Sequence, residues 1–122
     1  MLYNSKTLRL RKKSTFVRLS NKRMKIAILG YGKMGKVIEK IALKRGHSIL
    51  LKVNRENLDF DLKLLKNCDV AIEFSSPESA VNNINKCFDA NVPVVVGTTG
   101  WYAEFNAVQE RCISENKGLL YA

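Results

Sequence analysis

The sequence is poor in the residues that build metal sites and disulfide frameworks. Among 122 residues there are one histidine and three cysteines, and no two cysteines form a CxxC pair. A structural zinc site usually takes its four ligands from closely spaced pairs, so one histidine and three widely spaced cysteines do not match its pattern. Cys68, Cys87 and Cys112 are odd in number and widely spaced, and we expect them to be reduced, mostly buried thiols.

Long hydrophobic runs are also lacking. No stretch approaches the ~18 uninterrupted apolar residues of a membrane-spanning helix, so we expect no membrane partner. Hydrophobic residues make up 46% of the chain and charged residues 26%. This composition excludes a wholly disordered or fibrous chain, and the length is that of about one domain.

Acidic residues are absent from the first 23 positions. This segment carries eight lysines and arginines, and therefore eight of the ten net positive charges. Residues 24–122 hold 13 basic and 11 acidic residues, so they are nearly neutral. We predict a disordered basic tail over residues 1–23 in a cytoplasmic protein; an organelle-targeting leader is the alternative. Because no aromatic stacking pattern accompanies the charge, we expect no nucleic-acid partner.

The part after the tail alternates between strand and helix patterns. We expect strands over residues 25–29, 48–53, 69–73, 93–97 and 118–121, and helices over 33–45, 59–66, 77–90 and 102–116. Ser76 and Pro77 are typical of a helix start, as N-cap and first helical residue. The alternation predicts an α/β fold: a Rossmann-like doubly wound parallel sheet of about five strands with helices on both faces. Residues 24–122 are thus expected to form a dinucleotide-binding domain.

A GxGxxG motif, GYGKMG, lies between the first expected strand and the first helix. Gly30 permits a tight turn, Gly32 lets the backbone approach a pyrophosphate, and Gly35 allows the helix to pack closely on the strand. The N–H groups of the first helical turn then face the phosphates. The expected pyrophosphate site is Gly30, Tyr31, Gly32, Lys33, Met34 and Gly35. The strand before the motif and the helix after it are the context that the motif requires.

The end of the second strand is the place where an acid usually binds the ribose 2′-hydroxyl of NAD. Here the sequence is Asn54-Arg55-Glu56. Asn54 lacks the charge that repels a 2′-phosphate, and Arg55 could pair with one, which favours NADP(H). Asparagine also hydrogen-bonds a hydroxyl, and a small register shift would restore the acid through Glu56. We therefore expect NADP(H) or NAD(H), with dual use.

Two later loops are expected at the same edge of the sheet. The third strand runs into Phe74 and Ser75, and the fourth runs into the sequence GTTG, residues 97–100. The carboxyl ends of parallel strands share one edge, where ligands bind. Glycines there admit a flat ring, and the hydroxyls of Thr98 and Thr99 can form hydrogen bonds.

Three segments, GYGKMG, DVAIEFSSPESA and VPVVVGTTGW, together resemble the N-terminal domain of dihydrodipicolinate reductase, also called 4-hydroxy-tetrahydrodipicolinate reductase. This family belongs to the diaminopimelate route of lysine biosynthesis, and the resemblance covers residues 24–122. It implies pyrophosphate binding by residues 30–35 and places the other cofactor contacts at Asn54, Arg55, Phe74, Ser75, Gly97, Thr98, Thr99 and Ala122. Many members have one more residue in the glycine turn, and many have an acid where Asn54 stands.

The resemblance implies hydride transfer from a reduced nicotinamide to a cyclic dicarboxylate, with loss of water. In the family, a catalytic histidine and a substrate-binding lysine come from a second, downstream domain. We expect that domain to be absent here, because the only histidine, His47, follows the first helix on the edge opposite the cofactor. The chain alone is then inactive, and homo-oligomers belong to the complete protein. The alternatives are another NAD(P)-dependent oxidoreductase and a stand-alone dinucleotide-sensing module without catalysis.

Overall fold

The computed structural model describes residues 22–122, so the expectations for the basic tail lie outside the described residues except at its last two positions. The elements in chain order are β1 (Lys25–Leu29), α2 (Lys33–Lys44), β2 (Ser48–Val53), α3 (Leu62–Lys66), β3 (Val70–Glu73), α4 (Pro77–Ala90), β4 (Val94–Val96), η1 (Tyr102–Glu104), α5 (Phe105–Ser114) and β5 (Leu119–Tyr121). None of the helices in this part of the chain combines the length and the hydropathy needed to cross a membrane.

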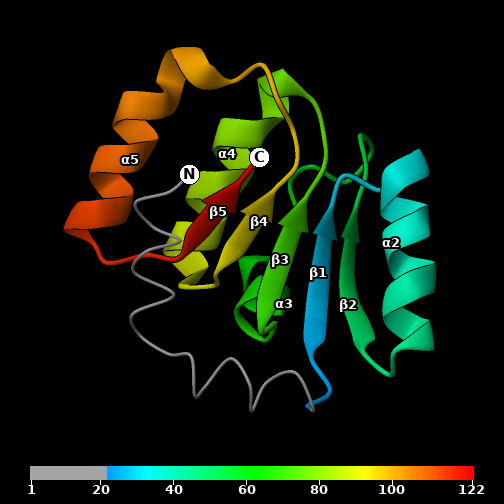
Figure 1. Ribbon diagram of the computed structural model, residues 1–122. Coiled ribbons are helices and arrows are strands. Elements are labelled where there is room, and N and C mark those ends of the chain that lie inside the picture. The colour runs from blue at the N-terminus through cyan, green and yellow to red at the C-terminus, as the bar shows by residue number, and fades with distance from the viewer. Residues whose placement is uncertain (1–21) are drawn as a thin grey trace.

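The strands form one five-stranded sheet in the order β2-β1-β3-β4-β5 (Figure 1). Every neighbouring pair is parallel. The interior strand β1 is buried on both faces because it has four apolar residues in succession, from Ile26 to Leu29. The Rossmann-like parallel sheet predicted from the sequence is therefore confirmed.

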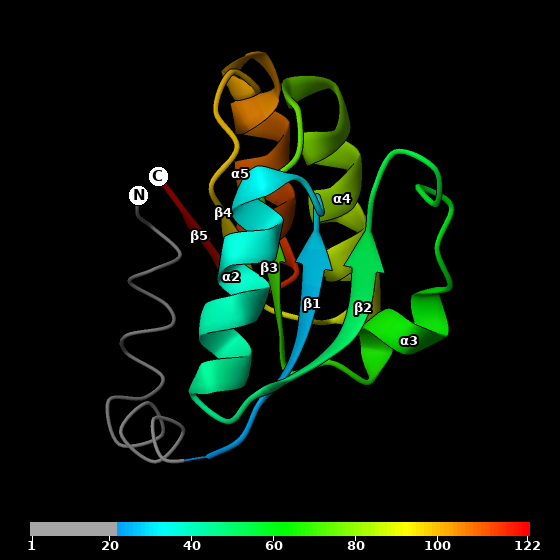
Figure 2. The ribbon, with the colours of Figure 1, turned by 90° about the vertical axis from the view of Figure 1, so that its right-hand side faces the viewer.

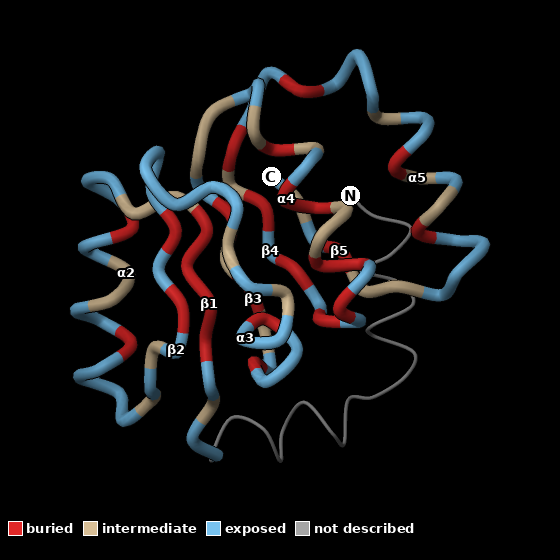
Figure 3. The backbone as a smooth tube through the Cα atoms, turned by 180° about the vertical axis from the view of Figure 1, so that it is seen from behind, coloured by how far each residue is buried: buried red, intermediate tan, exposed pale blue. Residues whose placement is uncertain are grey.

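Helices lie on both sides of the sheet, but they cover the two faces unequally (Figure 2). The larger core joins α3, α4 and α5 to one face, to which β1 contributes Ala27 and Leu29. The smaller core joins α2 to the other face through Ile28 and Ala42. Helix α2 packs mainly on β1 and β2, and Val95 of β4 remains 40% exposed on that face. Helices on both faces are therefore confirmed, and buried positions lie along the strands of the sheet, as seen from behind in Figure 3.

The start and end of α4 follow local signals. Pro77 is its first residue and Ser76 its N-cap, although the Ser76 side chain makes no capping hydrogen bond. Asn91 ends the helix in the left-handed conformation, with φ 57°. The helix expected over residues 102–116 is instead divided into η1 and α5. Trp101, only 3% exposed, anchors this turn by donating from Nε1 to the carbonyl oxygen of Thr98 at 2.8 Å.

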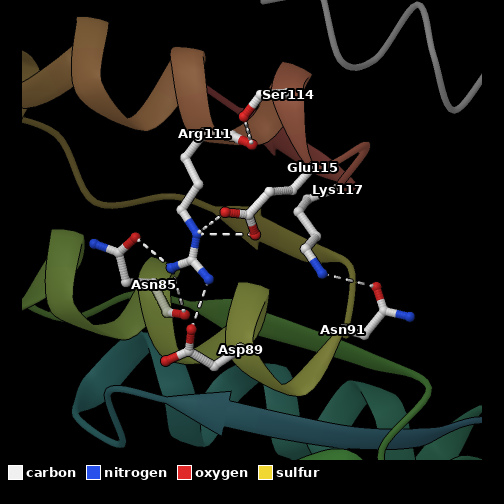
Figure 4. Close-up of polar contacts among 7 residues, drawn as sticks. All are labelled: Asn85, Asp89, Asn91, Arg111, Ser114, Glu115 and Lys117. Atoms are coloured by element: carbon white, nitrogen blue, oxygen red, sulfur yellow. Dashed lines mark hydrogen bonds and ion pairs between the residues drawn. The ribbon is translucent and has the colours of Figure 1, made fainter.

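Arg111 of α5 joins this helix to α4 (Figure 4). Its Nη1 donates to Asn85 Oδ1 at 2.9 Å, and its Nη2 lies 2.6 Å from Asp89 Oδ1. Its Nε donates to Glu115, one turn further along, at 3.1 Å. The guanidinium carbon also lies 5.3 Å from the centroid of the Phe88 ring. One side chain thus holds both helices at the surface of the larger core.

Candidate functional site

A pocket of about 810 Å³ opens at the carboxyl edge of β1, β2 and β3. The turn after β1, the loop after β2, the loop after β3 and the first half of α4 form its walls. It is lined by Gly30, Tyr31, Gly32, Val53, Asn54, Arg55, Glu56, Leu58, Phe74, Ser75, Ser76, Glu78, Ser79 and Asn83. Ligands bind at this edge in open parallel sheets, so the pocket is the candidate site.

Two glycines of the turn after β1 are required by the packing of the protein itself. Gly30 has φ +112°, and a Cβ on it would lie 2.0 Å from the carbonyl oxygen of Phe74. A Cβ on Gly35 would lie 2.4 Å from the carbonyl oxygen of Gly30. The N–H groups of Gly30 and Tyr31 both donate to the carbonyl oxygen of Val53 at 2.8 Å. The turn is thereby fixed against the ends of β2 and β3.

Gly32 differs from the other two glycines. A Cβ on this residue would meet no protein atom within 4 Å, and Gly32 lines the pocket. It is also the N-cap of α2, which receives no side-chain capping bond and has no acidic residue in its first turn. The first N–H groups of a helix attract anions. Helix α2 therefore presents an open anion-binding terminus at the pocket.

Tyr31 makes the side wall of this turn. Its hydroxyl donates to Glu39, whose other oxygen lies 3.0 Å from Lys52 Nζ. The hydrogen bond to Glu39 raises the pKa of Tyr31, and the same bond, followed by the one from Lys52, lowers the pKa of Glu39. Lys52 Nζ also lies 5.1 Å from the Tyr31 ring centroid. The ring is thus held against α2 and β2.

The loop after β2 carries the residues expected at the adenosine end. Asn54 Oδ1 accepts from the N–H of Glu56 at 2.8 Å, and Asn57 Oδ1 accepts from the N–H of Asn54 at 2.6 Å. Arg55 and Glu56 both line the pocket, as Asn54 does. The structure therefore leaves the choice between NADP(H) and NAD(H) open, as the sequence does. Arg55, which favours a 2′-phosphate, and the acid Glu56 both line the pocket beside Asn54.

The loops after β3 and β4 meet beside the pocket. Phe74 and Ser75 line it, and the Phe74 ring covers Gly97, where a Cβ would lie 2.2 Å from a ring atom. Thr98 is 7% exposed, and its Oγ1 accepts from the N–H of Ser75 at 2.7 Å and donates to Glu73 at 2.6 Å. The Thr98 hydroxyl, expected to face a ligand, is therefore used inside the protein.

Half of the sequence-predicted residues lie on the pocket wall, and the other half do not line it. Those on the wall are Gly30, Tyr31, Gly32, Asn54, Arg55, Phe74 and Ser75; those outside it are Lys33, Met34, Gly35, Gly97, Thr98, Thr99 and Ala122. Lys33 and Met34 are exposed on the first turn of α2, and Thr99 is exposed after β4. Ala122 follows β5, where its N–H donates to the carbonyl oxygen of Val96 at 3.2 Å.

Helix α4 contributes lining residues that the sequence reasoning missed. Ser76, Ser79 and Asn83 lie on one face of this helix and line the pocket. Their spacing of three and four residues was the available signal, because such residues share a helix face. The other missed lining residues are Val53, Leu58 and Glu78, and Glu56, considered at the ribose only as an alternative, lines the pocket as well.

His47 lies at the opposite edge of the sheet, as expected. It precedes β2, and its Nδ1 accepts from the N–H of Met24 at 3.0 Å. The residue is half-buried rather than freely exposed, and it joins the starts of β1 and β2. Its position is therefore a structural one, away from the pocket.

Comparison with known proteins identifies the family of this chain. The family model described as "Dihydrodipicolinate reductase, N-terminus" matches residues 24–122. The chain belongs to this family. The match includes every element from β1 to β5, and therefore the whole pocket.

Curated relatives of this dihydrodipicolinate reductase domain carry the name 4-hydroxy-tetrahydrodipicolinate reductase. The protein from Christiangramia forsetii is 43% identical over 99 residues, which are 81% of this chain and 41% of that protein. The protein from Neisseria gonorrhoeae is 27% identical over 121 aligned residues, which are 81% of this chain and 45% of that protein. The chain thus spans less than half the length of these relatives.

Among solved structures, the domain is similar to aspartate semialdehyde dehydrogenase II from Vibrio cholerae. The TM-score is 0.54 at 17% sequence identity, over 82% of this chain and 38% of that structure. A second structure of the same enzyme, in complex with ASA, gives the same TM-score and identity. At this identity the likeness concerns the fold alone.

Proposed function

We propose that residues 24–122 are the nicotinamide dinucleotide-binding domain of a reductase with the activity of its named relatives, 4-hydroxy-tetrahydrodipicolinate reductase. One observation carries the proposal: the open, uncapped terminus of α2 at Gly32 faces a pocket of about 810 Å³. Protein packing requires no glycine at position 32, whereas a pyrophosphate that contacts the backbone there does. The residues present therefore fit a dinucleotide.

In this proposal the strand order sets the order of the cofactor contacts. Residues 30–35 hold the pyrophosphate over β1, and Asn54 and Arg55 hold the adenosine ribose at the end of β2. The nicotinamide half then extends over β3 and β4, towards Phe74, Ser75, Gly97, Thr98 and Thr99, with Ala122 at the start of the following loop. Arg55 supports NADP(H) and Glu56 supports NAD(H), so we propose dual use of the two cofactors.

A bound reduced nicotinamide supplies a hydride for a cyclic dicarboxylate substrate. The residues of this domain bind and orient the dinucleotide, and none of those that line the pocket is a histidine or a lysine. A general acid must lie within hydrogen-bond reach of the atom that it protonates, and His47 lies at the other edge of the sheet. We therefore propose that the 122-residue chain binds the cofactor but does not reduce the substrate by itself.

The proposal extends to the setting of the complete protein. It is a cytoplasmic enzyme whose homo-oligomer contacts lie outside residues 24–122. We expect no nucleic-acid partner, because no aromatic stacking pattern or recognised module accompanies the basic residues 1–23, and residues 24–122 carry a net charge of only +2.

Two glycines provide a matched test, because a Cβ on either Gly32 or Gly46 meets no protein atom within 4 Å. The dissociation constants of NADH, NADPH and ADP-ribose are measured by calorimetry for the wild-type chain, Gly32→Ala and Gly46→Ala. The melting temperature of each chain is measured without ligand. Gly46 follows α2 with φ +90°, far along the helix from the pocket.

We expect the two variants to separate affinity from stability. Gly32→Ala should weaken all three ligands at least tenfold, about 1.4 kcal/mol, with a loss of stability below about 1 kcal/mol. Gly46→Ala should lower stability by about 1–2 kcal/mol, because alanine is strained at positive φ, and leave the affinities unchanged. A wild-type chain that binds none of the ligands, or a Gly32→Ala chain with full affinity, would refute the proposal.

A further inference from the structure

One carboxylate is buried beneath the wall of the pocket. Glu73, the last residue of β3, is 0% exposed. The buried polar residues of the described chain are Glu73, Asn83 and Thr98, and all three belong to one hydrogen-bonded group. A buried carboxylate is costly unless several donors surround it. Glu73 itself does not line the pocket, so its role must act through its partners.

Three side chains donate hydrogen bonds to the Glu73 carboxylate. Its Oε1 accepts from Thr98 Oγ1 at 2.6 Å, and its Oε2 accepts from Asn83 Nδ2 at 3.1 Å and from the Ser75 hydroxyl. Thr98 Oγ1 also accepts from the N–H of Ser75 at 2.7 Å, so the Thr98 hydroxyl links the Glu73 carboxylate to the backbone of the loop after β3.

The three partners come from three different segments. Ser75 lies in the loop after β3, Thr98 in the loop after β4, and Asn83 on α4. Ser75 and Asn83 line the pocket directly. One carboxylate thus fixes the two loops and the helix relative to one another, at the side of the pocket away from Asn54 and Arg55.

We propose that Glu73 is a positioning residue for the nicotinamide half of the dinucleotide. It holds the loop after β4 against the loop after β3, and so shapes the end of the pocket that the nicotinamide reaches. The inference rests on the proposed function, because it takes the adenosine half to lie over β2 and the pyrophosphate over β1. In the strand order β2-β1-β3-β4, the Glu73 group then lies under the other half of the ligand.

Two ligands separate this role from a general effect on stability. ADP-ribose contains the adenosine and pyrophosphate parts of NADH but lacks the nicotinamide. The ratio of the two dissociation constants therefore reports on the nicotinamide end alone. A variant that merely loosens the fold weakens both ligands together.

The test uses the 122-residue chain with Glu73→Gln, Thr98→Val and Thr98→Ser. Glutamine keeps the shape of Glu73 but replaces one acceptor oxygen by a donor, which leaves a partner hydroxyl or amide unpaired. Valine at position 98 removes the tie between the loops, and serine retains the hydroxyl. Val108→Ala serves as the control, because Val108 is buried in α5 and its truncation lowers the melting temperature away from the pocket.

We expect Glu73→Gln and Thr98→Val each to weaken NADH at least tenfold while ADP-ribose changes less than twofold. The double variant should be no weaker than the stronger single variant, since both remove the same tie. Thr98→Ser should retain more NADH affinity than Thr98→Val. Val108→Ala should leave the ratio unchanged.

Two results would overturn the inference: a parallel loss of both ligands in Glu73→Gln and Thr98→Val, or full NADH affinity in both. A wild-type chain with equal affinity for NADH and ADP-ribose would overturn it as well. If Glu73→Gln fails to fold, Thr98→Val carries the same test, because it changes only a neutral hydroxyl. A wild-type chain that binds neither ligand contradicts the proposed function instead.

Discussion

Replacement of Arg111 by methionine should destabilise the protein by removing the contact between α4 and α5. Methionine keeps most of the apolar stem over Phe88 but removes the charge and all donors. The losses are the bonds to Asn85 Oδ1 at 2.9 Å, to Asp89 at 2.6 Å and to Glu115 at 3.1 Å (Figure 4). The substitution thus tests the charge and the donors of Arg111, together with the contact of its guanidinium with the Phe88 ring.

The magnitude follows from the exposure of the partners. Asp89 and Glu115 are about half-exposed, with side-chain values of 52% and 46%, so each ion pair contributes roughly 0.2–1 kcal/mol. The hydrogen bond to Asn85 adds about 1 kcal/mol. The sum is about 1.4–3 kcal/mol, which lowers the melting temperature of a domain of this size by roughly 6–24 °C.

The pH and salt dependence of the destabilisation by Arg111→Met separates the ion pairs from the hydrogen bond to Asn85. The Asp89 hydrogen bond, followed by Glu115, raises the pKa of Arg111. Because the pKa of Arg111 is higher in the folded protein, the charged guanidinium stabilises the fold at every pH below the unfolded pKa. This stabilisation is lost only as the pH rises through the folded pKa. The contribution of Arg111 should therefore not change with pH near neutrality. At 1 M salt the Debye length is about 3 Å, and the two exposed pairs should lose most of their share.

The assay is thermal unfolding of the wild type, Arg111→Met, Asp89→Asn and the double variant at low and high salt. Arg23→Met, at an exposed position before β1, is the matched control and should change stability by less than about 0.5 kcal/mol. We expect coupling between Arg111 and Asp89 that shrinks at high salt. Equal melting temperatures for Arg111→Met and Arg23→Met would show that the network adds nothing to stability.

Two further predictions concern side chains away from the pocket. Burial raises the pKa of Cys87 to about 12, so this thiol should resist alkylation in the native protein at pH 8 and react only on unfolding, at a rate that denaturant increases; rapid native labelling, read by mass spectrometry, would contradict this. The pKa of Glu39 lies below its usual value of 4.5 because the Tyr31 hydroxyl and Lys52 bind its carboxylate. Its stabilising effect is therefore complete above pH 4.5 and is lost as the pH falls through the folded pKa, so Glu39→Gln should reduce the difference in melting temperature between pH 6 and pH 3. An unchanged difference would count against the network.

The strands were predictable because each is a short apolar run bounded by turn residues. The bounds of β1 and β2 agree with the sequence-based ranges, and those of β3, β4 and β5 differ by one residue at one or both ends. Parallel strands buried on both faces read as continuous hydrophobic runs. The alternation with helices then left few topologies to consider.

The unequal cover of the sheet could not be predicted from the same runs. Strand β4 reads Val94-Val95-Val96, which is typical of burial on both faces, yet Val95 is 40% exposed. Leu120 of β5 is 38% exposed on the same face. A hydrophobic run shows that both faces of a strand are apolar. It does not show whether a helix covers each face, because one helix covers only a few neighbouring strands.

The glycine turn was predictable because its function depends on local spacing. Gly30, Gly32 and Gly35 lie within six residues, and the strand before them and the helix after them are adjacent in sequence. The part of the pocket wall formed by α4 depends instead on which face of this helix points toward the glycine turn, and α4 is far from that turn in the sequence. Ser79 and Asn83 were therefore not predicted to line the pocket, although residues four positions apart share one face of a helix.

The hydrogen bond between Ser75 and Thr98 depends on the register of β3 and β4, which the sequence does not reveal. In the ladder of β3 and β4, Ala71 pairs with Val94 and Glu73 with Val96, an offset of 23 positions. Ser75 and Thr98 are separated by the same offset, so their hydrogen bond continues the register two residues beyond the last ladder pair. Ser75 and Thr98 lie two residues beyond the ends of β3 and β4, and if the alternation of side chains continues over those residues, Ser75 shares the face of Glu73 and Thr98 the face of Val96. The register then accounts for the convergence of Glu73, Ser75 and Thr98, and for the inward direction of the Thr98 hydroxyl.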